Sequence, residues 1–553
     1  MHSDPSATLS GEERGAGVVN GSLNGQVFPA RDIACTLPTP TTQDTSLKGN
    51  ALKRRERLSR EEPFGVTAII GGTNVRFCIS APQLADAATP GVAEPLVSSV
   101  KWQELKNHLA PRLTELGINF EDAHHIVLPL LAEKCVSFIA SHFDKTGEPP
   151  PFHNIAAFDF SVAGVVHGEG LNSTISTTNT GLRFSNDQTA LQFISSLQNE
   201  LAKRAWPAIP QENIAVMNDA AAGLLGETIA GGLQGVKNGL FVIIGTGVGS
   251  MGWTTKPGDA GPTIDLDFNE LGHRAVFDSS RRLEVVLNKG DELSAFIEED
   301  GSFKSLELHE RYVENVLAGP WCAINFVESF KSKPTVMMKL AETIARANIR
   351  KVAEDAQKTA EETEELLTGE TFKEEVGKVH KGLYALANLQ SQDRTRWAVS
   401  SNSHLVRAVN NFLLNPDPEV VFEHMPCDYR VEEMTNSNPE AALPLLAYSA
   451  WKEYCKNIGL FVGKAYSVMS EQGNTPDKII VGGGIGEMAN RYPALLRKVA
   501  LKLIHEHGNV PNGVVDFSRM SPESRECART YQLVDEKMAE IRAESRLTGE
   551  MPH

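Results

Sequence analysis

Short apolar runs that end in glycine recur along the chain and predict buried strands. Apolar, β-rich residues fill 65–70, 239–244 and 478–481, and each run leads directly into a glycine-rich segment. Two further strands are expected at 155–166 and 214–217. Short runs of this composition, bounded by glycine, are typical of strands covered on both faces.

Longer segments with helical spacing lie between these runs. They cover 102–116, 123–143 and about 493–503. Strands that alternate with helices predict an α/β protein. The stretch 339–389 is rich in Ala, Glu and Lys, and Lys351, Glu354 and Lys358 have the spacing of charge pairs on a helix. This stretch predicts an inserted helical subdomain.

The first residues show neither pattern. Residues 1–47 are rich in Gly, Ser, Thr and Pro, and a charged run at 53–57 follows. We therefore predict a disordered tail over 1–63, with order beginning at Phe64. The acidic residues Asp4, Glu12 and Glu13 argue against a transit peptide here.

Composition narrows the class of protein. The 553 residues carry a formal net charge of −17, which disfavours binding to nucleic acid because that affinity rests on Lys and Arg. Seven cysteines are scattered without a CxxC pair, so free thiols in a reducing compartment are expected. No apolar stretch reaches the roughly 18 residues that span a bilayer, and no secretory signal opens the chain. We expect a cytoplasmic protein with no membrane partner.

Three glycine-rich turns are candidate phosphate sites, because glycine lets backbone amides approach an anion. They are Gly71-Gly72-Thr73-Asn74-Val75-Arg76, Gly245-Thr246-Gly247-Val248-Gly249 and Gly482-Gly483-Gly484-Ile485-Gly486. None ends in the Gly-Lys-Ser/Thr of a Walker A loop. Taken alone, the first also fits a hairpin turn, and the third fits a tight turn into a helix or a dinucleotide fingerprint.

Asp219 is a candidate catalytic carboxylate. It follows the strand expected at 214–217 and precedes three alanines. A carboxylate at this place can accept a proton as a general base. The same pattern also fits a helix N-cap. His273 is also a candidate site residue, and it could equally be a histidine of the core. Because no second His and no Cys cluster accompany it, a zinc site is not expected.

The order of these motifs resembles the bacterial-type glucokinases, a family of actin-like sugar kinases. Ile70-Gly71-Gly72-Thr73-Asn74 is similar to the first phosphate motif, and the other two turns are similar to the second phosphate motif and the adenosine motif. The matching intermediate segments are Ser161-Val162-Ala163-Gly164, Thr178-Asn179, Met217-Asn218-Asp219, Glu270-Leu271-Gly272-His273 and Glu314-Asn315. The resemblance covers about 64–333 and 420–546.

The resemblance implies a two-domain actin-like (ribonuclease H-like) α/β fold with a cleft between the domains. A small domain is expected over 64–217, a large one over 218–527 with a helical insertion at about 335–420, and a C-terminal helix over 528–553 that returns to the small domain. It also implies ATP-dependent phosphorylation of a hexose, glucose first, and a homodimer.

The resemblance assigns roles to individual residues. Asp219 would be the general base, and Mg²⁺ would accompany ATP, with its ligands left open. The sugar would be bound by Asn179, Asn218, Glu270, His273 and Glu314. ATP would be bound by Gly71, Gly72, Thr73, Asn74, Arg76, Gly245, Thr246, Gly247, Gly249, Gly482, Gly483 and Gly484.

Two positions depart from the family pattern. Ile69 stands where the first phosphate motif has an aspartate that helps to hold Mg²⁺, and Leu182 stands where many relatives have tryptophan. Two alternatives therefore stay open beside an active glucokinase. One is a catalytically weak or inactive relative that binds sugar as a sensor or scaffold, and the other is a kinase of an amino or N-acetylated hexose.

Overall fold

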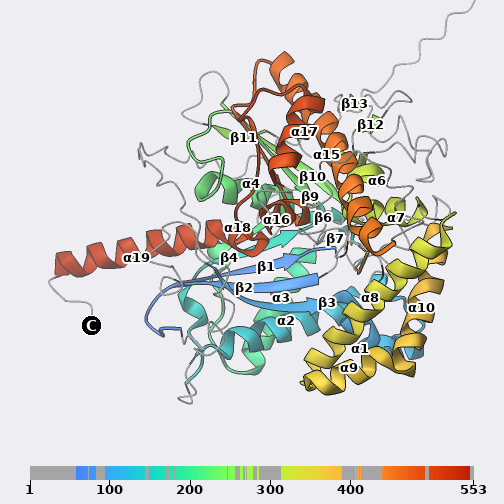
Figure 1. The fold of residues 1–553 in the computed structure, drawn as a ribbon. Helices are drawn as coiled ribbons and strands as arrows, with labels where there is room; N and C mark the ends of the chain where they lie inside the picture. Colours follow the sequence, from blue (N-terminus) through green and yellow to red (C-terminus); the bar gives the residue numbers. More distant parts are fainter. Residues whose placement is uncertain are drawn as a thin grey trace, which may run out of the picture.

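The computed structural model describes most of the chain from Leu58 to Thr548. The described residues are 58–72, 74–81, 94–143, 148–167, 173–177, 182, 184–187, 189–245, 247–255, 262–265, 268, 271–273, 275–277, 283–285, 313–329, 331–388, 405, 408–409, 412, 439–491 and 497–548. Figure 1 shows two halves, each built on its own sheet, with helices packed around them.

The first half is built on a five-stranded sheet in the order β3-β2-β1-β4-β8. β1 is antiparallel to β2 and parallel to β4, which is in turn parallel to β8. The elements of this half are β1 (Phe64–Ile70), β2 (Asn74–Ser80), β3 (Leu96–Lys101), α1 (Trp102–Leu116), α2 (His124–Ala140), β4 (Ile155–Val162), β5 (Val165–His167), β6 (Thr174–Thr177), β7 (Phe184–Asp187), α3 (Thr189–Lys203) and β8 (Ile214–Asn218), with short 3₁₀ turns at Phe120–Asp122, Phe152–Asn154 and Gln211–Asn213.

The second half repeats this arrangement. Its five-stranded sheet has the order β11-β10-β9-β14-β15, again with antiparallel strands on one side of β9 and parallel strands on the other. Its elements are α4 (Asp219–Ile229), β9 (Gly239–Ile244), β10 (Val248–Thr254), β11 (Thr263–Asp265), the 3₁₀ turn η7 (Leu271–His273), β12 (Ala275–Phe277), β13 (Leu283–Val285), α6 (Val313–Leu317), α15 (Pro439–Glu471), β14 (Lys478–Gly482), α16 (Gly484–Arg491), α17 (Lys498–Gly508), β15 (Val515–Phe517) and α18 (Pro522–Glu526). The C-terminal helix α19 (Ala528–Thr548) follows and returns to the first sheet. Two sheets of the same order confirm the predicted actin-like α/β class.

A helical region adjoins the second half. It contains α7 (Gly319–Glu328), α8 (Pro334–Asp355), α9 (Ala360–Thr368) and α10 (Glu370–Ala387), which Figure 1 draws in yellow and orange at one side. Leu340, Ile344 and Leu383 lie in its separate apolar core. Lys358 follows the end of α8, so the three charges expected on one helix are divided between α8 and the connection to α9.

Both faces of β1 are covered, which explains its unbroken apolar sequence. Val66, Ala68 and Ile70 point into the core of the first half. On the opposite face β1 meets α19, where a Cβ on Gly65 would lie 2.7 Å from the Cβ of Thr530. The C-terminal helix therefore packs on the first sheet, and Figure 1 shows its end projecting from the body.

α4 and α18 lie between the two sheets (Figure 1). Ala220 and Leu224 of α4 pack on Phe241 and Ile480 of the second sheet. The other side of α4 contacts α18 and α19. Because α4 begins where β8 ends, this one helix joins the carboxyl edge of the first sheet to the second sheet.

The structure changes three expectations about element boundaries. Order extends before Phe64, because Leu58 is buried and its N–H donates to the carbonyl of His142 at 2.9 Å. The single strand expected over 155–166 is divided into β4 and β5. The helix expected over 493–503 is α17, which begins at Lys498, with residues 492–496 outside the described ones. In the described part of the chain, no helix is long and apolar enough to cross a membrane.

Candidate functional site

The carboxyl ends of three parallel strands meet at one edge of the first sheet. The N–H of Ala163, just after β4, donates to the carbonyl of Ile70 at the end of β1 at 3.0 Å. The side-chain amide of Asn218, at the end of β8, donates to the carbonyl of Gly164 at 2.8 Å. The first glycine turn and Asp219 are therefore brought to the same edge.

Asn218, and not Asp219, is the N-cap of α4. Its Oδ1 accepts from the N–H of Ala220 at 2.8 Å and of Ala221 at 3.2 Å. The alternative that Asp219 is the N-cap was therefore wrong, because the cap is the preceding residue, Asn218. Asp219 is the first residue of α4, is half-buried, and its Oδ1 also accepts from the N–H of Ala220 at 2.9 Å. A carboxylate at the first turn of a helix is favoured in its charged form by the helix dipole.

The first glycine turn is a tight hairpin between β1 and β2. The N–H of Gly71 donates to the carbonyl of Asn74 at 3.0 Å, and the indole N–H of Trp102 donates to the carbonyl of Gly71 at 2.9 Å. The side-chain oxygen of Asn74 is buried and has no hydrogen-bond donor among the described residues. Buried polar atoms are normally satisfied, so a donor from a ligand or a water is expected here.

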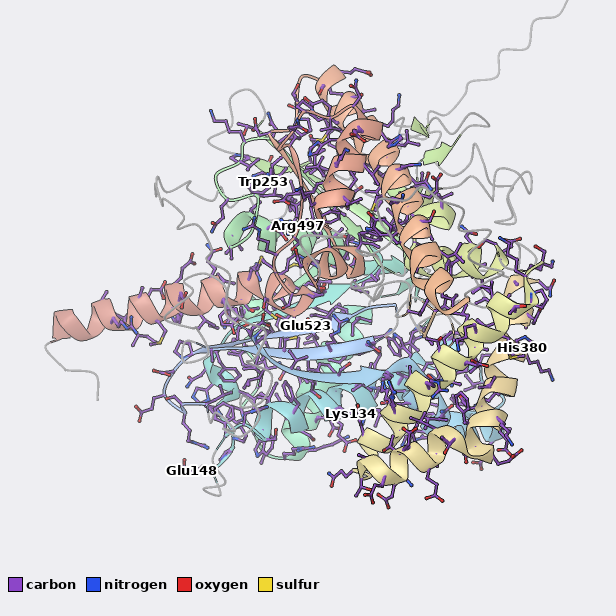
Figure 2. All side chains as sticks on the ribbon, viewed as in Figure 1. Lys134, Glu148, Trp253, His380, Arg497 and Glu523 are labelled. Carbon is purple, nitrogen blue, oxygen red and sulfur yellow. The ribbon has the colours of Figure 1, made fainter. Side chains whose placement is uncertain are left out.

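Arg76 already has a carboxylate partner. Its guanidinium lies 3.1 Å from Glu523 of α18, and both side chains are about a quarter exposed. Glu523 lies at the level of α18, between the two halves, in Figure 2. A role for Arg76 in neutralising phosphate stays a prediction, and it requires this ion pair to open or to be shared.

The second and third glycine turns lie against each other. Gly483 has a positive φ of 77°, and a Cβ there would lie 2.4 Å from the carbonyl oxygen of Ile244, the last residue before the second turn. Only glycine fits both conditions. By contrast, no atom of the described residues lies within 4 Å of the Cβ positions of Gly245 and Gly484, so each turn has a side that these residues leave open.

The second turn also approaches the start of α4. A Cβ on Gly249 would lie 3.4 Å from the Cβ of Ala220, the residue after Asp219. Gly247 closes this turn by accepting from the N–H of Gly245 at 2.9 Å. The two phosphate-type turns of the second sheet and Asp219 therefore lie in one region.

The predicted segments around His273 and Glu314 form η7 and α6, and both elements lie near β10. The N–H of Leu271 in η7 donates to Ser250 Oγ at 2.9 Å, and Ser250 Oγ donates to the carbonyl of Phe268 at 2.8 Å. A Cβ on Gly272 would lie 2.1 Å from the carbonyl oxygen of Val248, so η7 is pressed onto the strand. α6 in turn packs against η7.

Several predicted site residues have side chains outside the described part of the chain. Asn179, Thr73, Thr246 and Glu270 lie outside the described residues, and for His273 and Glu314 only the backbone elements η7 and α6 are described. The roles of these residues stay predictions.

Ile69 occupies an apolar cluster rather than a place beside a metal. It is buried with Cys78 and Cys527, and Tyr531 packs against them. The neighbouring thiol of Cys527, together with burial, raises the pKa of Cys78 well above its usual value. Neutral thiols and an isoleucine do not fit Mg²⁺, which prefers oxygen ligands. Among the described residues, no group of three or more His, Cys, Asp or Glu side chains could hold a metal ion.

Two buried carboxylates on this face of the first sheet were not predicted. Asp159 on β4 pairs with Arg529 of α19, and Glu526 of α18 accepts from Ser161 Oγ at 2.8 Å. Burial raises the pKa of both, that of Asp159 to about 6 despite the attraction of Arg529. The available signal was the aspartate inside the apolar run of β4, but its partner lies 370 positions away.

The raised pKa of Asp159 predicts a pH-dependent stability. Because the folded-state pKa exceeds the unfolded one, the contribution of this group is fully present below about pH 4 and is lost as pH rises through about 6. The loss is on the order of 3 kcal/mol. We expect the free-energy difference between wild type and Asp159→Asn to change by this amount from pH 4 to pH 7 in denaturant titrations.

Asp122→Asn, a substitution of an exposed aspartate in the turn Phe120–Asp122, is the matched control and should show no such change. A pH-independent difference for Asp159→Asn would contradict the assignment.

Comparisons with known proteins gave structural neighbours only. No protein-family model matches the sequence, and no curated protein matches it. The structure is similar to a ROK family glucokinase from Streptomyces griseus in complex with glucose and AMPPNP, at 14% identity over 85% of this chain and 98% of that one, with a TM-score of 0.38.

Two further neighbours have related descriptions. A glucokinase from Balamuthia mandrillaris in complex with glucose is 13% identical over 85% of this chain and 94% of that one, with a TM-score of 0.40. A ROK family transcriptional regulator, a homolog of the E. coli MLC protein, is 13% identical over 86% of this chain and 79% of that one, with a TM-score of 0.38. At these scores and identities, no residue's role is transferred from these neighbours.

Proposed function

We propose that this chain is an ATP-dependent kinase of a hexose, with glucose as the first substrate to test. The observation that carries the proposal is the placement of Asp219. It starts the helix that joins the two sheets. Ala220 beside it lies close to Gly249 of the second glycine turn, and Ile244 before that turn lies close to Gly483 of the third. A carboxylate next to turns that can approach phosphate is the arrangement that phosphoryl transfer to a hydroxyl requires.

In this proposal Asp219 accepts the proton of the sugar hydroxyl as that oxygen attacks the γ-phosphate of ATP. The open sides of Gly245 and Gly484 allow backbone amides to approach the nucleotide. Asn179, Asn218, Glu270, His273 and Glu314 would contact the sugar. For Asn218 this contact must be shared with its capping role, since its Oδ1 and Nδ2 already have partners.

The remaining expectations belong to the same proposal. The protein would act in the cytoplasm, with sugar and ATP as its ligands and no nucleic acid or membrane partner, and it would form a homodimer. Mg²⁺ would accompany ATP, but among the described residues the side chain at position 69 of β1 is an isoleucine, which offers it no oxygen ligand.

The direct test is release of ADP from Mg-ATP by the purified chain, with and without glucose. A panel including mannose, glucosamine, N-acetylglucosamine and N-acetylmannosamine separates a glucokinase from a kinase of an amino or N-acetylated hexose. Release of ADP that none of these sugars stimulates would contradict the proposal.

The buried position of Ile69 favours a second candidate, a sugar-binding relative with little or no catalysis. An apolar residue fills the place where a metal-binding carboxylate is expected from the resemblance, and neighbouring thiols close it off. Such a protein would bind glucose without releasing ADP. Glucose binding measured by calorimetry, beside the ADP assay, separates the two candidates.

Substitution of Ile69 gives a prediction of its own. Under the proposed function we expect Ile69→Asp to lower the free energy of unfolding by about 3 kcal/mol, because it buries a charge in the apolar cluster with Cys78 and Cys527, and to leave kcat no higher than in wild type. Chemical denaturation and the ADP assay measure both. Ile69→Asn, similar in size but uncharged, is the control.

Turnover that appears only in Ile69→Asp, with a silent wild type that still binds glucose, would instead establish the second candidate.

A further inference from the structure

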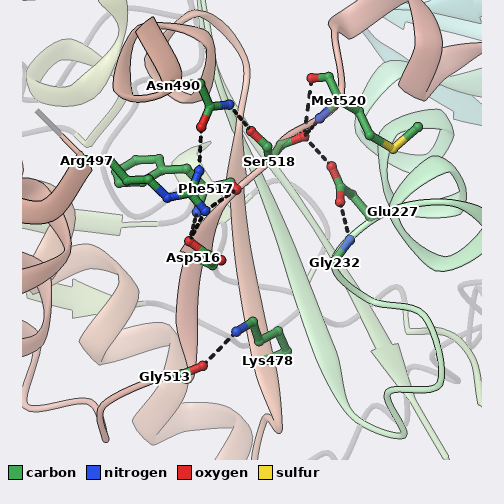
Figure 3. A network of polar contacts seen from close by, with 10 residues as sticks. All are labelled: Glu227, Gly232, Lys478, Asn490, Arg497, Gly513, Asp516, Phe517, Ser518 and Met520. Carbon is green, nitrogen blue, oxygen red and sulfur yellow. Dashed lines mark hydrogen bonds and ion pairs between the residues drawn. The ribbon is translucent and has the colours of Figure 1, made fainter. Parts of the chain in front are cut away.

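A buried serine joins the helix after the third glycine turn to the helix that carries Asp219. Ser518 follows β15 and is 2% exposed. Its N–H donates to the carbonyl of Val481 at 2.9 Å, and its own carbonyl accepts from the side chain of Asn490 in α16 at 2.5 Å. Its hydroxyl donates to Glu227 of α4 (Figure 3).

Glu227 is a fully buried carboxylate two turns after Asp219 on the same helix. One oxygen accepts from Ser518 Oγ, and the other accepts from the N–H of Gly232 at 2.8 Å. In the described part of the chain, no lysine or arginine forms an ion pair with it. A buried carboxylate held by neutral donors depends strongly on each of them.

α16 is fixed to the same serine from the other side. Arg497 donates to Asn490 and lies 2.5 Å from Asp516 (Figure 3). The asparagine side chain is thereby oriented toward the carbonyl of Ser518. Because α16 begins at Gly484 in the third turn, Asn490 connects the helix that starts in that turn to Ser518.

A buried arginine completes the junction. Arg525 of α18 is 1% exposed, and its Nη1 donates to Ser518 Oγ at 3.2 Å. A Cβ on Gly226 would lie 2.1 Å from the Arg525 carbonyl oxygen, and one on Gly482 would lie 3.1 Å from Arg525 Nη1. α4, α18 and the end of β14 are therefore closely packed against one another. In such packing, a displacement of one element requires the other two to move.

We propose that Ser518 and Glu227 are positioning residues that couple nucleotide binding at the third glycine turn to the placement of Asp219. The proposal rests on the proposed function, since it takes ATP as the ligand of that turn. Binding shifts α16, Asn490 carries the shift to Ser518, and the hydroxyl of Ser518 holds α4 through Glu227. Neither residue touches substrate.

Hydrogen exchange measures this coupling without requiring catalysis. We expect ADP to slow amide exchange over 220–228 of α4 in the wild type, and Ser518→Ala to abolish this effect while ADP still binds. Ser518→Thr, which keeps the hydroxyl, should restore it. Ser470→Ala is the matched control, because Ser470 Oγ bonds only the carbonyl of Tyr466 on its own helix among the described contacts.

Kinetics give a second readout. Ser518→Ala should lower kcat about 10-fold and change the KM for sugar less than about 2-fold, because a displaced base slows the chemical step more than it weakens sugar binding. Glu227→Gln should behave similarly and serves if Ser518→Ala proves unstable in thermal unfolding.

The outcomes separate this proposal from the one on which it rests. A wild type that binds no ADP overturns both. A wild type that binds ADP, with the same protection of α4 in Ser518→Ala and Glu227→Gln, overturns the coupling alone and leaves the proposed function standing.

Discussion

Asp219→Asn is expected to lower kcat for glucose phosphorylation about 1,000-fold and to leave the KM for glucose within about 2-fold of wild type. The asparagine has nearly the same shape but cannot accept a proton from the sugar hydroxyl at neutral pH. Steady-state ADP release over a range of glucose concentrations, with saturating Mg-ATP, measures both constants.

Loss of folding cannot account for an effect of this size. A 1,000-fold change corresponds to about 4 kcal/mol in the activation free energy. Removing one negative charge from the first turn of α4 costs at most about 2 kcal/mol of stability, and the N-cap at Asn218 is untouched. Thermal unfolding of the variant should therefore stay close to that of the wild type.

Asp477→Asn is the matched control, because Asp477 is a surface aspartate that accepts from the N–H of Asn238 at 3.0 Å, in front of β9. Its kcat should equal that of the wild type. A retained kcat in Asp219→Asn would remove this residue from the role of base and weaken the kinase proposal as a whole.

The sequence predicted the strands that end in glycine because their signal is local. The runs before Gly71, Gly245 and Gly482 became β1, β9 and β14, and the helix expected over 102–116 is α1. Two buried faces and a turn residue are enough to define such a strand. The runs themselves do not show how these strands pair into two sheets, and the resemblance implied only a two-domain actin-like α/β fold.

The third turn shows where local signals failed. Three glycines in 482–484 and a fourth at Gly486 predicted a loop, since glycine is a poor helix former. In the structure α16 starts at Gly484, and a Cβ on Gly486 would lie 3.0 Å from the carbonyl oxygen of Val481. Close packing of this helix on the sheet selects glycine there despite its low propensity.

The candidate site was predictable only in part for a similar reason. Asp219 and the turns could be found from residues that are adjacent in sequence. The junction at Ser518 could not, because Glu227 and Ser518 are 291 positions apart and neither belongs to a motif. The pairing of Asp159 with Arg529 was hidden in the same way.

The second large effect is expected from a substitution at Gly483, where the third glycine turn lies against the residue before the second. Gly483→Ala should lower the free energy of unfolding by about 4 kcal/mol, since a positive φ costs an L residue about 1–2 kcal/mol and overpacking adds about 1–3. The neighbour that must give way is the backbone of Ile244, which cannot rotate out of reach as a side chain can. Denaturant unfolding measures the loss.

Gly513→Ala separates the cost of backbone strain from the cost of overpacking. Gly513 has a similar positive φ of 86°, but none of the residues that the structure describes comes within 4 Å of its Cβ position, so only the backbone strain of about 1–2 kcal/mol is expected. Moving Ile244 also displaces the turn at Gly245, so Gly483→Ala should weaken ADP binding more than about 10-fold, whereas Gly513→Ala should leave it unchanged. Equal losses of stability in the two variants would mean that the turns are not in contact. Undiminished ADP binding in a folded Gly483→Ala protein would mean that the nucleotide is not held by this pair of turns.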